Sequence, residues 1–158
     1  MAKDIRQQIV EAVVTRFQTI TTGNGYETNI GNNVKRWRAA SNSPFAAGDL
    51  NVLNIKDTQA TPNSDDTPMG VTEYELEIHA EAATRDATIA TDETCRKMLA
   101  DLIKACGTDR RWSDLAWDTR LETSSLDVQQ VGDIIGGCQL AFIIIFRTPN
   151  FDPYTTQH

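Results

Sequence analysis

The sequence lacks the features that mark several large classes of protein. Its three cysteines are far apart and form no Cys-x-x-Cys pair, so neither a disulfide framework nor a zinc ribbon is indicated. No apolar run approaches the roughly 20 residues that cross a bilayer, and the N-terminus has no signal-peptide core. We therefore expect a protein of a reducing cytoplasm that lies outside the membrane.

Catalytic signatures are missing as well. The chain has two histidines and contains no HExxH, GxSxG or Walker sequence. His79 lies near Glu75 and Glu77 on a predicted strand, where a carboxylate could raise its pKa, but a small hydrolase would need further groups that the sequence does not offer. We expect neither an enzyme nor a cofactor.

Positive charge is scarce. The 158 residues include 15 Lys and Arg against 22 Asp and Glu, which gives a net charge of −7. A protein that coats nucleic acid needs a basic footprint, so this balance argues against one and leaves room only for a local basic strip. A length of 158 residues with 40% hydrophobic content fits a single globular domain, residues 1–158.

Hydrophobic periodicity predicts two amphipathic helices. Apolar residues recur at helical spacing over residues 4–20 and again over residues 87–106. Gly23 and Gly25 are expected to end the first helix, and Gly107 is expected to cap the second.

Strands are predicted between the helices. The turn residues Gly31-Asn32-Asn33 tolerate positive φ and favour a hairpin between residues 26–30 and 34–38. Residues 49–57 are apolar on both faces, as in an interior strand. The polar stretch of residues 57–70 is expected to be a flexible loop.

The second half of the chain adds three strands. Residues 71–82 alternate strictly between apolar and polar side chains, and two further strands are expected over residues 117–126 and 133–149, with a C-terminal tail over residues 149–158. The two helices must bury their apolar stripes on this sheet. We therefore predict an α+β fold of two layers, a largely antiparallel β-sheet with two amphipathic helices packed on it.

Two candidate surfaces follow from charge. The first is a basic aromatic strip, Lys35, Arg36, Trp37 and Arg38, in which alternation sends Lys35 with Trp37 to one face and both arginines to the other. Such a split strip suits nucleic acid poorly. Trp37 could simply cover the edge of the core, or the strip could be a protein interface, where Trp and Arg are enriched.

The second surface is acidic. Glu73, Glu75 and Glu77 share one face of the strictly alternating strand, where like charges repel each other. In a ring of subunits, this face could line a negative lumen that does not retain DNA. Asp65 and Asp66 could bind a divalent cation, but they lack the spacing of a calcium loop, so a solvated or interface loop is the simpler interpretation.

The order of these segments resembles a known family. The succession "IRQQIVEAVVTRF", "TTGNGYETNIGNNVKRWR", "DLNVLNIKD", "VTEYELEIHAEA", "RRWSDLAWDTRLE" and "CQLAFIIIFRT" is similar to tail-terminator or minor-tail (tail-completion) proteins of tailed bacteriophages. The pieces "GYETNIG…V…WR" and "IIIFRTP" carry most of the resemblance, which covers nearly the whole chain in order and length.

The resemblance implies a structural virion protein that is not an enzyme. Such a subunit forms a ring, typically a hexamer, on the head-proximal end of the tail tube, ends tube polymerisation and presents a surface to the head or neck connector proteins. Phage DNA passes through the lumen without specific binding, and assembly takes place in the host bacterial cytoplasm. The alternatives are a head–tail joining (connector) or other minor tail protein, or a nucleic-acid-binding module.

Overall fold

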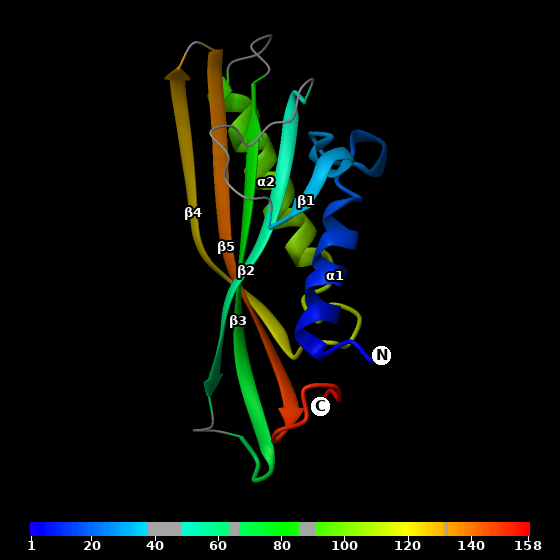
Figure 1. Ribbon diagram of the computed structural model, residues 1–158. Helices are drawn as coiled ribbons and strands as arrows, with labels where there is room; N and C mark the ends of the chain where they lie inside the picture. The colour runs from blue at the N-terminus through cyan, green and yellow to red at the C-terminus, as the bar shows by residue number, and fades with distance from the viewer. Residues whose placement is uncertain (38–48, 64–66, 86–90, 132) are drawn as a thin grey trace.

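The computed structural model describes residues 1–37, 49–63, 67–85, 91–131 and 133–158 (Figure 1). It has the expected α+β architecture, with a five-stranded sheet and two α-helices. The elements in chain order are α1 (Ile5–Phe17), the 3₁₀ turns η1 (Thr22–Asn24) and η2 (Ile30–Asn33), β1 (Val34–Arg36), β2 (Asn51–Asn63), β3 (Val71–Thr84), α2 (Thr91–Thr108), β4 (Asp118–Val131) and β5 (Asp133–Pro149).

The strands lie in the order β1-β2-β3-β5-β4. Every neighbouring pair is antiparallel except β1 and β2, which are parallel. Both helices lie on one face of this long, twisted sheet (Figure 1). The opposite face carries no helix in the described part of the chain, and we call it the open face.

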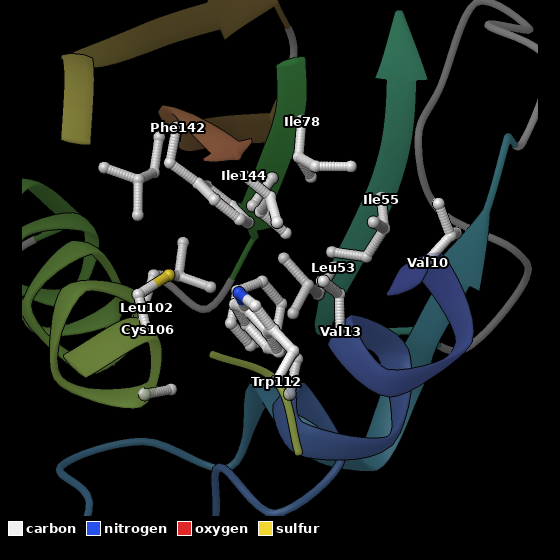
Figure 2. Close-up of a cluster of buried hydrophobic side chains, with 14 of the residues drawn as sticks. Val10, Val13, Leu53, Ile55, Ile78, Leu102, Cys106, Trp112, Phe142 and Ile144 are labelled. Atoms are coloured by element: carbon white, nitrogen blue, oxygen red, sulfur yellow. The ribbon is translucent and has the colours of Figure 1, made fainter. Parts of the chain in front are cut away.

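An aromatic cluster forms the centre of the core. Trp112 lies between α2 and α1, close to Phe142 of β5 (Figure 2). The Trp112 and Phe142 rings stack at 6.2 Å, and Phe17 meets both rings edge-on at 6.5 and 6.1 Å. The buried indole Nε1–H donates to Thr119 Oγ1 at 2.8 Å, so its one polar atom is satisfied.

The helix ends differ from the prediction. Asp4 caps α1 by accepting a hydrogen bond from the Gln7 N–H at 2.7 Å, but the helix ends at Phe17, well before the glycines. Gly25 instead caps η1, with φ of 82°. Gly107 was expected to cap the second helix, but it lies inside α2.

The predicted hairpin over residues 26–38 is wrong. Its second arm is the short strand β1, which pairs with β2 in parallel. The backbone N–H groups of Glu27 and Thr28 donate instead to the buried Asp101 carboxylate of α2, at 3.0 and 2.8 Å. Gly31 N–H donates to Ile20 O at 2.9 Å. Because Asp101 and Ile20 accept from these backbone N–H groups, the groups are not available to form a strand ladder.

The flexible loop predicted over residues 57–70 is wrong in its first half. β2 continues to Asn63 and pairs with β3 from Ala60↔Leu76 to Asn63↔Glu73, after an irregularity between Asp57 and Ala60. Pro62 is compatible with this strand because β1 has already ended, so its missing N–H interrupts no ladder there.

The prediction that residues 49–57 form an interior strand is confirmed, since β2 lies between β1 and β3 with Val52 and Leu53 both buried. The alternation along β3 is also confirmed, with Leu76, Ile78 and Ala80 fully buried. The predicted C-terminal tail follows β5. Its backbone is tied back to α1, because Ile5 N–H donates to Pro153 O at 2.8 Å.

Candidate functional site

The basic strip lies at the β1 edge of the sheet. Lys35 and Arg36 are exposed, and the indole of Trp37 is 55% exposed. Trp37 has φ of 44°, so the chain leaves the strand conformation here, and the alternation predicted to continue to Arg38 is broken. Arg38 itself lies outside the described residues.

A single carboxylate fixes the position of Trp37. Asp57 Oδ1 accepts from the indole Nε1–H at 2.6 Å, while Oδ2 accepts from the Arg6 guanidinium of α1 at 2.7 Å. Asp57 is the β-partner of the buried Ile78, and Arg6 belongs to a helix, so this cluster lies on the helix-bearing side of the sheet. The indole is therefore tied to Asp57 by a hydrogen bond, while about half of the surface of Trp37 is in solvent.

The acidic ladder lies on the open face of β3, and every glutamate has a partner. Glu73 accepts from Arg147 at 2.8 Å, Glu75 from Arg120 at 3.1 Å, and Glu77 binds His79 Nε2 at 2.6 Å. The Arg120–Glu75 pair joins β4 to β3 across the intervening strand β5. Arginines of neighbouring strands thus compensate the charges of Glu73 and Glu75, while Glu77 is hydrogen-bonded within its own strand.

His79 is held by two side chains. Besides Glu77, its other ring nitrogen Nδ1 contacts the Gln139 amide of β5. The imidazole ring lies on the open face. Glu77, His79 and Gln139 therefore form a hydrogen-bonded row that runs from β3 to β5.

A second tryptophan borders the open face. Trp117 is 47% exposed, and the Arg147 guanidinium lies 4.3 Å from its ring centroid. Trp117 N–H donates to Ile145 O at 2.7 Å just before β4 begins. A cation–π contact therefore continues the charged row at this end of the sheet.

The β4 edge carries an apolar groove that sequence reasoning missed. Leu121 and Leu126 pair with the core residues Phe142 and Cys138 of β5, yet they are 50% and 40% exposed. A groove of about 390 Å³ lies beside Leu121, between α2 and β4. It is lined by Ile103, Cys106, Gly107, Arg110, Thr119, Arg120 and Leu121. The sequence gives no sign of this groove, because it depends on α2 packing beside β4, the outermost strand of the sheet.

The left-handed turn before β4 was also unforeseen. Trp112, Ser113 and Asp114 all have positive φ, between 51° and 64°. Asp109 holds this turn by accepting from the Ser113 and Arg111 N–H groups, at 2.7 and 2.9 Å. The Ser113 hydrogen bond is also the largest cause of the lowered pKa of the Asp109 carboxyl.

The three cysteines are buried thiols, as expected. Burial raises the pKa of Cys106 and of Cys138 to about 12, and it raises the pKa of Cys95 as well. Among the residues described, no group of three or more His, Cys, Asp or Glu side chains is arranged to hold a metal ion. Asp65 and Asp66 lie outside those residues.

No helix in the described ranges is both long enough and apolar enough to cross a membrane. Comparison with known proteins finds no family model that matches the chain, and no curated protein that matches its sequence.

Proposed function

We propose that the chain is a structural subunit of a tailed-bacteriophage virion. Its copies form a ring on the head-proximal end of the tail tube, end tube polymerisation and present a surface to the head or neck connector proteins. The resemblance of the segment order to tail-completion proteins motivates this proposal. It contains no catalytic step and needs no cofactor.

The structural observation that supports a ring is the pair of free sheet edges. Within the described residues, β1 and β4 each pair on one side only, and they lie at opposite ends of the sheet. An unpaired strand edge is a template for another chain. Two different edges on one subunit permit a head-to-tail contact, and such contacts close into rings when the rotation between copies allows it.

The open face suits a lumen through which DNA passes. β3 places Glu73, Glu75 and Glu77 on this face and contains no lysine or arginine, so it presents no row of cations to the DNA. Retention of DNA requires neutralisation of phosphates by Lys and Arg. A surface on which Arg120 and Arg147 are already bound to carboxylates offers little of this.

Tail length tests the proposal. Electron microscopy of lysates in which the gene is silenced should show overlong tubes of variable length beside tailless heads. Supply of the chain from a plasmid should restore uniform tails. Tails of normal length that fail to join heads would instead favour the head–tail joining role, and normal infectious particles would refute both.

A further inference from the structure

We propose that the Lys35–Trp37 edge of one copy binds the β4 edge of a second copy, with Trp37 seated in the groove between α2 and β4. This inference rests on the proposed ring and names the joint between its subunits. The two surfaces lie at opposite edges of the same sheet. Every copy can therefore use both surfaces at once.

The strand directions fit this joint. From the pairing, β1 and β2 run one way, β3 runs the other way, β5 runs with β2, and β4 runs against it. A second copy in the same orientation would thus bring its β1 antiparallel to β4. The sheet would continue from copy to copy with all helices on one side.

The apolar surfaces also lie on matching faces. Trp37 is held on the helix-bearing side by Asp57, and Leu121 pairs with the core residue Phe142 on that same side. The groove beside Leu121 has a volume of about 390 Å³ and is lined by Ile103 and Gly107. Gly107 presents no side chain, and a Cβ there would meet no atom within 4 Å, so the groove is open to an incoming ring.

Charge favours this partner over a symmetric one. The β1 edge exposes Lys35 and Arg36, and the β4 edge exposes Glu122, while the two arginines that line the groove, Arg110 and Arg120, are bound to Asp118 and Glu75. A head-to-tail joint brings bases to acids. Two β4 edges paired with each other would bring acid to acid, which destabilises a cross-strand contact. Trp and Arg are also the residue types that most often dominate binding energy at interfaces.

A charge swap tests the joint in the full chain. Arg36→Glu or Glu122→Arg alone should weaken self-association at least tenfold, as measured by sedimentation velocity over a concentration series. The double variant carries both changes in every copy, so it should regain assembly. Normal assembly of both single variants, or no recovery in the double variant, would overturn the proposal.

A matched pair of tryptophans tests the groove. Trp37→Ala should abolish assembly, whereas Trp117→Ala, which removes a comparably exposed indole on the open face, should leave it intact. Urea unfolding of each variant checks that the subunit still folds. Equal loss in both variants, or loss in neither, would contradict the assignment of Trp37.

Cysteine cross-linking gives a readout that does not depend on loss of assembly. Arg36→Cys with Glu122→Cys in one chain should produce a ladder of disulfide-linked oligomers under oxidising conditions, because the native cysteines are buried. Rings that form without cross-links would refute this joint while the proposed function stands. Wild-type protein that forms no ring, either free or on purified tail tubes, would refute both.

Discussion

Gly136 of β5 lies directly against the first turn of α2, and Gly136→Ala should destabilise the fold. A Cβ at this position would lie 2.3 Å from Thr91 Cγ2 and 2.6 Å from Cys95 Sγ. Carbon atoms in good contact are about 3.5–4.0 Å apart, so the first turn of α2 must move by roughly 1 Å or more. Overpacking of this kind costs about 1–3 kcal/mol.

The adjacent glycine is a matched control. A Cβ on Gly137 would lie 3.4 Å from Ala82 O and 3.9 Å from Asp127 O, which is close to ordinary contact. Neither glycine has positive φ, so alanine suits both backbones. Both changes also reduce the entropy of the unfolded chain, which stabilises by about 0.4–1 kcal/mol and cancels in the comparison.

Urea unfolding followed by circular dichroism would measure the difference. We expect Gly136→Ala to lower the free energy of unfolding by about 1–3 kcal/mol relative to Gly137→Ala, with a fall in Tm of roughly 3–10 °C. Equal stability of the two variants would show that α2 does not contact β5 as closely as described.

Three further predictions concern groups that the fold buries or ties down. Asp101→Ala should lower the free energy of unfolding by about 2–5 kcal/mol, because it leaves the Glu27 and Thr28 N–H groups without an acceptor; unchanged hydrogen exchange at these two amides would contradict this. The Cys106 and Cys138 thiols, whose pKa burial raises to about 12, should resist iodoacetamide at pH 8 until urea unfolds the chain, and rapid labelling of the folded protein would contradict their burial. The Asp109 pKa is lowered in the folded state, so its contribution is present above the ordinary value of 3.8 and is lost as the pH falls below it; Asp109→Asn should flatten the acid limb of a stability–pH curve, and an unchanged limb would refute this role.

Local sequence patterns correctly predicted the elements whose buried face does not depend on which other element packs against them. The alternation of residues 71–82 places Leu76 and Ile78 in the core whichever strand lies beside them. The apolar stripes of both helices are buried for the same reason. The turn prediction at Gly31 was less informative. Glycine was taken as a sign of a hairpin turn, but it is needed here for close packing, since a Cβ would lie 2.6 Å from Phe17 O.

The candidate surfaces depended on long-range order, which local patterns do not contain. The glutamates of β3 were expected to repel each other, but Arg120 and Arg147 come from strands near the end of the sequence. The groove at Leu121 exists because β4 is the outermost strand of the sheet. Neither the pairing nor the strand order can be read from residue spacing, so these features required the structure.

The position of β3 also affects how the chain folds. β3 can pair with β2 early, because a short connection joins them, but its other edge must wait for β5, which follows α2 and β4 in the sequence. Long-range pairing of this kind slows folding and leaves a strand edge exposed to other chains in the meantime. During that interval, Arg120 and Arg147 are not yet in place, so Glu73 and Glu75 lack their partners. Their mutual repulsion then protects the waiting edge from aggregation, as charged gatekeeper residues do.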